Sequence, residues 1–352
     1  MTHQKAGGSE GATVRLKQQA MIDSNQPAKS FVVARETAHG AGVGALTGAV
    51  VAIGNFDGVH RGHRAVIAAA QARAKALGRK AAALTFAPHP RLFFRPQEPV
   101  FQLSDERAKL RLLAGAGLDG GIIMRFDAAL AGTSAEEFVG RILVDRLQVG
   151  GAAIGFDFHF GRGRAGSPAL LAEQGARLGF PVDIVPKLED EGRPISSGAV
   201  RNALASGEVV EAAELLGAPW FVSGEVIHGE KRGRALGFPT ANLRLDQSCG
   251  LKHGIYAVRV QVSGRRHGGV ASFGRRPMFD HGAPLLEAFL FNFDGDLYGK
   301  AIDVAFIGWI RPEQAFASVD DLKRAMNADC LRAHDVLARA GDAFPVLGAV
   351  PA

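Results

Sequence analysis

Hydrophobic positions follow two different patterns along this chain of 352 residues. Between residue 49 and about residue 204, short apolar runs alternate with segments of helical period. The runs at 49–53, 81–86, 121–124, 152–154 and 182–185 predict strands, and the segments at 64–77, 104–114, 134–147 and 167–178 predict helices. Ser104 is the expected N-cap of the helix 104–114. Because strands and helices alternate, this part is expected to form an α/β domain whose doubly wound parallel sheet is covered on both faces.

The pattern changes near Gly207. A short helix is predicted for residues 209–216, because Gly217 and Pro219 supply a stop signal. Strand-like runs follow at 221–227, 254–262, 269–273, 286–293 and 302–310, and glycine-rich turns separate them. This half is therefore predicted to be a compact antiparallel β-barrel, which the helical segment 319–340 is expected to close.

These patterns divide the chain into four parts. Residues 1–46 are polar and rich in glycine, and we interpret them as an N-terminal extension that is partly disordered. Residues 47–206 form the predicted α/β domain, 207–219 a linker helix, and 220–345 the barrel domain. No internal repeat relates the two halves, so we expect two different domains rather than a duplication.

Composition narrows the class of protein. The hydrophobic content of 47% and the charged content of 22% are typical of a soluble globular protein. The net charge of +6 suits an enzyme whose ligands carry phosphates, whereas the lack of Lys/Arg runs and the aromatic content of 7% argue against a nucleic-acid partner. No apolar segment is long enough to span a bilayer, so no membrane partner is expected. Cys249 and Cys330 lie outside any CxxC pattern, so neither a disulfide scaffold nor a zinc site is expected, and the cytoplasm is the default location.

The stretch from Gly54 to His63 lies between the first predicted strand and the first predicted helix. A helix N-terminus after a glycine-rich turn is an anion site, because free backbone N–H groups and the helix dipole point at the ligand. His60 and His63 are three residues apart, so they share a face of a helical turn and are candidates for contacting a triphosphate. The candidate phosphate-binding residues of the turn itself are Gly54, Asn55, Phe56, Asp57 and Gly58.

Two further segments follow predicted strands. In residues 85–90, His89 either faces the same pocket or is satisfied within its own turn. Residues 155–166 are suited to a flavin or adenine ring beside phosphates, although Asp157 could instead be an ordinary loop carboxylate. The candidate flavin-binding residues of this segment are Asp157, Phe158, Phe160 and Arg164.

Residues 195–201 predict the start of another helix. Ser196 and Ser197 can cap that helix and bind phosphate oxygens, and Arg201 offers a bidentate clamp. Ligands of α/β sheets sit at the carboxyl ends of the strands, where the turn after the first strand lies. The α/β domain is therefore predicted to bind a nucleoside triphosphate there.

The barrel half carries a second candidate phosphate site, in residues 224–242. Its glycines let backbone N–H groups approach a phosphate. On an extended chain Thr240 and Asn242 point the same way, and both offer the oxygen ligands that Mg²⁺ prefers, so both are candidate metal ligands. The candidate ATP-binding residues of this half are Gly229, Gly233, Arg234, Gly237, Pro239, Thr240 and Asn242.

Glu287 interrupts the apolar run 285–290. A carboxylate at the mouth of a barrel is a good general base for a primary hydroxyl. The alternative is an ordinary strand residue that faces outward. Glu287 is therefore the candidate catalytic base of the second half.

The segments of the first half together resemble the FMN adenylyltransferase module of the bacterial bifunctional riboflavin kinase/FAD synthetases, and the turn itself resembles the HxGH nucleotidylyltransferases. The patterns GxFDGxHxGH, TFxPHP, GxDFxFGxxRxG and ISSTxIR correspond to residues 54–63, 85–90, 155–166 and 195–201. Gly198 replaces the threonine of ISST, so one hydroxyl is missing. The residues that the resemblance assigns to the ATP phosphates are His60, His63, Ser196, Ser197 and Arg201.

The second half resembles the riboflavin kinase domain, whose PTAN motif holds Mg·ATP and stands here at 239–242. Further kinase segments follow in order at 254–257, 269–277, 286–289, 296–299 and 310–313. The resemblance implies that Glu287 takes the proton from the ribityl 5′-hydroxyl as it attacks the γ-phosphate, and that Mg²⁺ is needed with ATP. Two residues depart from the family pattern, Met278 and Phe289.

The chain is therefore interpreted as a bifunctional transferase that phosphorylates riboflavin to FMN and adenylylates FMN to FAD with release of pyrophosphate. Its expected partners are riboflavin, FMN and ATP, and its expected state is a monomer or a weak oligomer. One alternative is an enzyme with a single activity, in which Gly198 makes the adenylyltransferase the weaker half. Another is a non-catalytic flavin sensor or nucleic-acid binder, and the intact His60, His63 and Glu287 argue against it, since binding alone needs no base.

Overall fold

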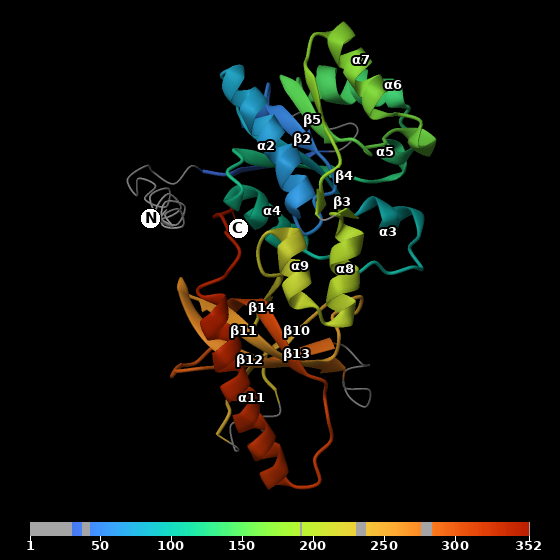
Figure 1. The fold of residues 1–352 in the computed structure, drawn as a ribbon. Helices are drawn as coiled ribbons and strands as arrows, with labels where there is room; N and C mark the ends of the chain where they lie inside the picture. The colour runs from blue at the N-terminus through green and yellow to red at the C-terminus, as the bar shows by residue number, and fades with distance from the viewer. Residues whose placement is uncertain (1–29, 37–42, 191, 230–236, 276–283, 352) are drawn as a thin grey trace, which may run out of the picture. The chain divides into compact units, whose positions relative to one another are not determined.

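The computed structural model describes residues 30–36, 43–190, 192–229, 237–275 and 284–351. All the elements below belong to one compact unit, residues 31–352. A six-stranded parallel sheet with the strand order β1-β4-β3-β2-β5-β6 forms the centre of the first half (Figure 1). Its strands are β1 (Val32–Glu36), β2 (Val50–Ile53), β3 (Ala81–Ala87), β4 (Gly120–Arg125), β5 (Gly151–Gly155) and β6 (Val182–Val185). The predicted parallel sheet is confirmed.

Helices cover both faces of this sheet. Helices α2 (Arg61–Ala76) and α4 (Glu106–Gly115) lie on one face, and η3 (a π-helix, Phe138–Arg146) and α7 (Pro168–Leu178) lie on the other. Short helices in the connections are η2 (Gly44–Leu46), α3 (Pro90–Phe94), α5 (Ala128–Gly132), α6 (Ala135–Glu137) and η4 (Arg162–Arg164). Helices α8 (Ser197–Ser206) and α9 (Val209–Leu216) pack against the core of the barrel described below. Val50 and Ala52 of β2 pack with α2 and α4, whereas Val51 and Ile53 pack with η3 and α7. Because both faces are buried, the strand reads as a continuous apolar run. A short hairpin of β7 (Glu189–Asp190) and β8 (Arg193–Pro194) precedes α8.

Two helices begin two or more residues away from the predicted start. Helix α2 begins at Arg61, three residues before the predicted start, because the side chain of His60 caps it. Helix α4 is capped by Asp105, whose carboxylate accepts a hydrogen bond from the N–H of Ala108. The prediction that Ser104 caps α4 is therefore wrong, and Ser104 takes part in the site described below.

The strand order reverses at β2, which has β3 on one side and β5 on the other. At such a switch point the loops leaving neighbouring strands diverge and open a crevice at the carboxyl ends of the strands. The turn that begins at Gly54 leaves β2 there, and the segment 155–166 leaves β5 there. Two of the predicted nucleotide-site segments therefore meet at this edge of the sheet.

The edge strand β1 lies inside residues 1–46, which the sequence pattern assigned to an extension. It pairs in parallel with β4 from Val32 opposite Gly120 to Glu36 opposite Met124. The boundary at residue 46 is therefore wrong, and the α/β domain already includes residue 32. The pattern missed this strand because its sequence, VVARE, ends its apolar run with two charged residues, as edge strands often do.

We expect a chain that begins at residue 47 to unfold more easily than one that begins at residue 30. Loss of β1 exposes the backbone edge of β4, and loss of Phe31 and Leu46 removes two buried side chains. Burial of one such side chain contributes about 1.5–3 kcal/mol, so the free energy of unfolding should fall by at least about 2 kcal/mol. Urea unfolding of the two chains measures the difference, and equal midpoints would show that β1 contributes nothing to the fold.

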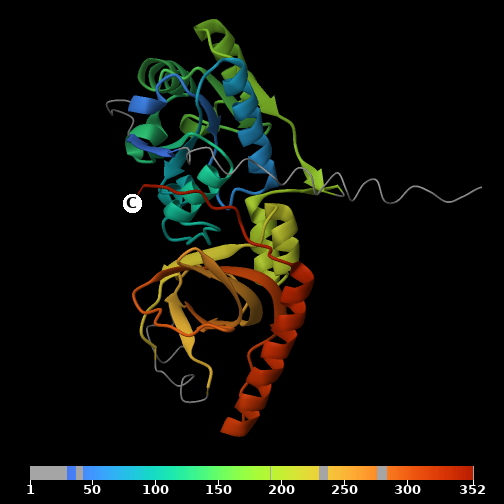
Figure 2. The same cartoon turned by 90° about the vertical axis from the view of Figure 1, so that its left-hand side faces the viewer.

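The second half is a nearly closed antiparallel barrel, as predicted, with the strand order β10-β13-β12-β11-β14-β9. Its strands are β9 (Phe221–Glu225), β10 (Thr240–Arg244), β11 (Gly254–Val262), β12 (Arg265–Arg275), β13 (Pro284–Leu290) and β14 (Ala301–Arg311). An isolated pairing of Ile227 with Asn242 links the two ends of this order. Figure 2 shows the ring of strands that results.

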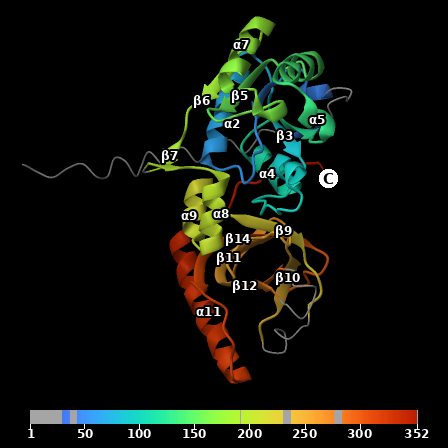
Figure 3. The same cartoon turned by 90° about the vertical axis from the view of Figure 1, so that its right-hand side faces the viewer.

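The long helix α11 (Val319–Ala340) runs along the outside of the barrel (Figure 3). It contacts β11, β12 and β14, and it has the bounds predicted from the sequence. Its buried Asp329 accepts hydrogen bonds from Arg311 at the end of β14, and the shortest, from Nη2 to Oδ2, measures 2.6 Å. This ion pair fixes the helix against the strand that precedes it.

Helix α4 also contacts the barrel. The guanidinium of Arg111 donates two hydrogen bonds of 2.7 Å to the carboxylate of Asp303 in β14. Ser223 of β9 donates to the same carboxylate at 2.6 Å. On the backbone side, the N–H of Gly348 donates to the carbonyl oxygen of Arg111 at 2.9 Å. Bidentate, charge-assisted bonds are stronger than neutral ones, so this contact is a firm anchor between α4 and the barrel.

Candidate active sites

The turn after β2 holds two residues in an unusual backbone conformation. Phe56 has a φ of +50° and Val59 a φ of +46°, although neither is glycine. Both side chains are fully buried, and this packing holds a conformation that costs about 1–3 kcal/mol per residue. Such residues cluster at binding and catalytic sites, so they support the prediction that this turn is functional.

Asp57 connects the turn to two other segments. Its carboxylate, 2% exposed, accepts hydrogen bonds from Nη2 of Arg201 at 2.5 Å and from the backbone N–H of Ser104 at 3.1 Å. The hydroxyl of Ser197 donates to the backbone oxygen of Asp57 at 3.0 Å. The structure therefore brings the turn and residues 195–201 together, with Asp57 as their common partner.

The residues predicted to clamp a triphosphate make contacts within the protein. Arg201 pairs with Asp57 and also donates from Nε to the backbone oxygen of Phe101 at 2.6 Å. The hydroxyl of Ser196 caps α8 by accepting a hydrogen bond from the N–H of Ala199 at 3.1 Å. Arg201 and Ser197 thus stabilise the turn, and their contact with phosphates stays a prediction.

His60 and His63 lie face to face at the start of α2. Their ring centroids are 3.6 Å apart, and Nδ1 of His60 accepts a hydrogen bond of 3.3 Å from the backbone N–H of His63. A Cβ at Gly62 would lie 3.1 Å from the His60 ring. The glycine between the two histidines therefore allows the His60 ring to lie against the helix.

Both imidazoles are neutral at pH 7. Burial is the main cause that lowers the pKa of His60 to about 4, and the charge of Arg201 adds to it. Burial, followed by the charges of His60 and Lys109, lowers the pKa of His63 well below its usual value. Because Nδ1 of His60 accepts a hydrogen bond, its proton is on Nε2. Nδ1 of His63 is buried without a hydrogen-bond partner among the described residues. The pair offers uncharged donors to an anion.

Lys109 of α4 belongs to the same cluster and was missed by the sequence patterns. Its side chain is 6% exposed. The charge of Lys109 helps to lower the pKa of His63. The signal was present, because Lys109 lies three and four residues before the buried Leu112 and Leu113, on the apolar side of α4.

Burial is the main cause that lowers the pKa of His89; the charges of Lys109 and Arg201 lower it further, and that of Asp57 opposes them. His89 is satisfied within its own turn, because its Nδ1 accepts a hydrogen bond of 3.2 Å from the backbone N–H of Arg91 and so caps α3. Its contact with the same pocket stays a prediction.

The segment 155–166 forms a small hairpin in which Phe160 and Gly166 exchange backbone hydrogen bonds of 3.1 and 2.8 Å. Phe160 is buried against Phe138, with ring centroids 5.3 Å apart, so its ring supports the hairpin from the core side. Phe158 is half-buried and stacks on Phe160 at 5.5 Å. Asp157 and Arg164 are exposed. Flavin contact stays a prediction for this segment, and the burial of Phe160 argues against direct contact by that ring.

In the barrel half, antiparallel pairing gathers the predicted kinase residues. Asn242 of β10 lies opposite Glu287 of β13, which lies opposite Ser272 of β12. Thr240 and Phe289 form the next pair on the same face. The candidate base and the two candidate metal ligands are therefore neighbours on one surface of the sheet.

Glu287 lies on the outer face of the barrel. Leu286 and Ala288 on either side of it fill the barrel core, whereas Glu287 is half-buried on the other face. The carboxylate of Glu287 was expected at the mouth of the barrel, and this placement is wrong, because it lies on the outer face. Aromatic side chains nevertheless cover part of this outer face, because the ring of Phe238 packs edge-on against that of Phe289 with the centroids 5.3 Å apart. This pair gives Glu287 an apolar wall beside it.

Asn242 has the surroundings of a ligand-binding amide. Its side chain is 5% exposed, and its Oδ1 is buried without a hydrogen-bond partner among the residues the structure describes. A Cβ at Gly229 would lie 2.5 Å from Nδ2 of Asn242, so the backbone passes directly over the amide and only glycine fits. An unpaired buried carbonyl oxygen favours a cation or a hydrogen-bond donor at this point.

The other predicted residues of this half are less informative. Gly237 and Pro239 are exposed just before β10. Gly233, Arg234 and Met278 lie outside the described residues. Within the described ranges no group of three or more His, Cys, Asp or Glu side chains is arranged to hold a metal. A cation bound here would therefore depend on a few protein oxygens and on the phosphates of its ligand, as Mg²⁺ commonly does.

Comparison with known proteins gives two family matches. The FAD synthetase family matches residues 44–199, and the riboflavin kinase family matches residues 216–337. The bifunctional riboflavin kinase/FMN adenylyltransferase of Pseudomonas fluorescens is 42% identical over 292 residues, which cover 83% of this chain and 94% of that protein. The protein of the same name from Escherichia coli (strain K12) is 40% identical over 289 residues, which cover 82% of this chain and 92% of that protein.

A solved structure is similar over both halves. The crystal structure described as a macrolide-efflux protein from Streptococcus pneumoniae has a TM-score of 0.75 at 30% identity, and it covers 85% of this chain and 97% of that chain. This agreement supports the two-part architecture described above. Among the helices that the structure describes, none is both long enough and apolar enough to cross a membrane.

Proposed function

This chain belongs to the family of bifunctional riboflavin kinases/FMN adenylyltransferases, and on that premise we propose which of its residues carry out each reaction. It makes flavin cofactors, converting riboflavin to FMN and FMN to FAD. We assign adenylyl transfer to the α/β domain, which includes β1 and ends near residue 206, and phosphorylation to residues 220–345. The two sites are on different domains, so each can be tested separately.

In the α/β domain, the phosphate of FMN attacks the α-phosphorus of ATP and pyrophosphate leaves, with no covalent enzyme intermediate. The observation that supports this assignment is the stacked, buried pair of His60 and His63 at the N-terminus of α2. Their neutral N–H groups and the helix N-terminus would donate hydrogen bonds to phosphate oxygens as charge moves during transfer. Arg201 and Ser197 would fix the turn through Asp57 and, as the resemblance implies, contact the triphosphate together with Ser196.

FMN would occupy the β5 side of the same crevice, next to the hairpin 155–166. Asp157 and Arg164 are exposed there, and Phe158 offers a partly exposed ring. An aromatic face beside a guanidinium suits a flavin that carries a phosphate. This placement leaves the turn after β2 for the triphosphate of ATP.

In the barrel, Glu287 would accept the proton of the ribityl 5′-hydroxyl while its oxygen attacks the γ-phosphorus of ATP and ADP leaves. The strand register supports this role, because it sets Glu287 beside Asn242. Thr240 and Asn242 would hold the Mg²⁺ that accompanies ATP, and the unpaired Oδ1 of Asn242 fits a cation. When bound, Mg²⁺ neutralises charge on the phosphates. Phe289 and Phe238 would form the wall for the flavin ring.

The proposed partners are riboflavin, FMN and Mg·ATP, and the proposed state is a monomer or a weak oligomer. We place both reactions in the cytoplasm, where Cys249 and Cys330, which are free thiols in this structure, stay reduced.

Turnover by the purified chain of 352 residues tests this assignment. With riboflavin and Mg·ATP, FMN should form first and FAD should follow. A second reaction that starts from FMN isolates adenylyl transfer, and added chelator should stop phosphorylation. FMN that accumulates without FAD would show that the α/β half is inactive, in line with the hydroxyl missing at Gly198. Absence of FMN would contradict the kinase assignment.

A further inference from the structure

The two carboxylates that act on Lys109 in the α/β site are each paired with an arginine. Arg201 is paired with Asp57, and Glu106, the other carboxylate that acts on Lys109, is paired with Arg35 at 2.5 Å. Among the described residues, the carboxylates of Asp57 and Glu106 act on the ammonium of Lys109 through their charge, and neither forms a hydrogen bond or ion pair with it. Lys109 as a residue is only 6% exposed, and placing a cation in such surroundings is unfavourable unless an anion or hydrogen-bond acceptors meet it. The folded protein therefore holds a cation that lacks a close counter-ion.

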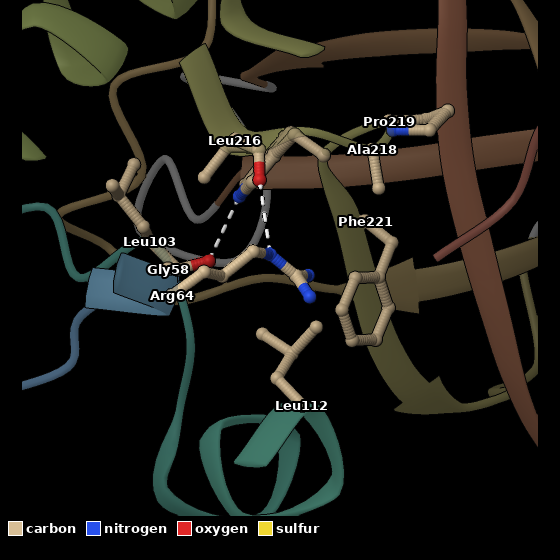
Figure 4. Close-up of a pocket in the computed structure, with 9 residues that line it drawn as sticks. Gly58, Arg64, Leu103, Leu112, Leu216, Ala218, Pro219 and Phe221 are labelled. Carbon is tan, nitrogen blue, oxygen red and sulfur yellow. Dashed lines mark hydrogen bonds between the residues drawn. The ribbon is translucent and has the colours of Figure 1, made fainter. Parts of the chain in front are cut away.

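The position of Lys109 on α4 directs it toward the turn after β2. Leu112, three residues further along, lines a small pocket together with Gly58 and Arg64 (Figure 4). Residues three apart share a face of a helix, so Lys109 lies on the same side of α4. The hydroxyl of Ser104, just before α4, accepts a hydrogen bond of 3.0 Å from the N–H of Gly58. The first turns of α4 are thus docked against the turn that carries Asp57.

We propose that Lys109 binds the pyrophosphate part of ATP and stabilises it as the leaving group of adenylyl transfer. This role rests on the proposed function of the α/β domain. An oxygen of the FMN phosphate forms a bond to the α-phosphorus, the bond from that phosphorus to the bridging oxygen breaks, and its electron pair leaves with pyrophosphate. No proton is transferred. Negative charge grows on pyrophosphate during this step, and an ammonium already held in place stabilises it without reorganisation.

The topology favours pyrophosphate over FMN as the partner of Lys109. Helix α4 leads into β4, which lies on the β3 side of β2, whereas the proposed flavin hairpin follows β5 on the other side. The charge of Lys109 acts on His63 and His89, and Asp57 and Glu106 act on Lys109, so these groups are near one another; His63 is itself a proposed triphosphate contact. Lys109 is therefore on the ATP side of the crevice.

The full-length variant Lys109→Met tests this role, because methionine keeps the length and loses the charge. The inhibition constant of Mg·pyrophosphate against FAD formation should rise at least about tenfold, and kcat should fall about a hundredfold. The urea midpoint without nucleotide should stay equal or rise, since an apolar side chain replaces a buried charge that lacks a partner. The matched control is Arg107→Met on the exposed side of α4, which should leave all three measurements unchanged.

Wild-type pyrophosphate inhibition and wild-type kcat in Lys109→Met would overturn the proposal. So would a less stable variant that keeps its affinity for pyrophosphate, because Lys109 would then be structural only. If Lys109→Met fails to fold, Lys109→Gln is measured in the same way. If the unmodified chain forms no FAD, the proposed function fails instead, and calorimetric binding of Mg·pyrophosphate to the unmodified chain and the variant still decides the role of Lys109.

Discussion

Replacement of His63 by alanine is expected to slow FAD formation about a hundredfold, the scale of losing one transition-state contact, and to leave FMN formation at its original rate. His63 stacks on His60 at the N-terminus of α2, and its buried Nδ1 has no partner among the described residues. The proposed kinase residues lie on the barrel, on strands β10 and β13, so the substitution should leave them intact. Rates measured separately with riboflavin and with FMN reveal the two effects.

The riboflavin kinase rate of the same molecules is the control, because it reports whether the variant is folded. Loss of the edge-on contact between His63 and Phe56, whose centroids are 5.2 Å apart, should lower stability only slightly. A variant that makes FAD at the original rate would refute the assignment of the HxGH turn. Equal loss of both activities would point to misfolding rather than to a lost phosphate contact.

Glu287→Gln is expected to lower kcat for riboflavin phosphorylation by at least about a hundredfold and to spare adenylyl transfer. The amide keeps the shape of the side chain but cannot accept the hydroxyl proton. Its position between Asn242 and Ser272 on neighbouring strands is preserved, so riboflavin should still bind and KM for ATP should change little. Steady-state kinetics with riboflavin and with ATP as the varied substrate measure these constants.

Comparison with Thr240→Ala distinguishes the effect of losing the base from the effect of losing a metal ligand. Thr240→Ala removes an oxygen proposed to hold Mg²⁺, so it should raise KM for ATP more than it lowers kcat. Glu214→Gln, on the exposed side of α9, removes the same charge away from both sites and should behave like the original chain. If Glu287→Gln phosphorylates riboflavin at the original rate, Glu287 is an ordinary outward strand residue and the proposed catalytic role is wrong.

Elements with a clear period and clear ends could be predicted from the sequence to the residue. Strand β11 and helix α11 have the bounds that their alternation and amphipathic period indicated. Strand β1 could not be predicted, because an edge strand has fewer buried positions and tolerates charge. The start of helix α4 was predicted too early, because Ser104 and Asp105 are both good N-cap residues and the local sequence does not decide between them.

Some site residues could likewise be found from local sequence patterns, and others only from the fold. The turn after β2 and the residues near Arg201 were found because their glycines, histidines and serines form dense local patterns. The ion pair of Arg201 with Asp57 joins residues that are distant in sequence, so no local pattern specified it. Lys109 was missed because a lysine on a helix is normally exposed, although its place on the apolar side of α4 was a signal; the docking of α4 on the turn explains its burial.

The anchor between Arg111 and Asp303 limits how this enzyme can be divided by engineering. A chimera that joins its α/β domain to the barrel of a relative keeps Arg111 on α4, and the new barrel must present a carboxylate where Asp303 lies. If the new barrel has no carboxylate there, the mostly buried guanidinium of Arg111 loses both of its charge-assisted hydrogen bonds at the junction. Expression of the barrel alone leaves Asp303 with only the hydroxyl of Ser223 from this network. A carboxylate at the position of Asp303 is therefore a first criterion for choosing the relative whose barrel is to replace this one.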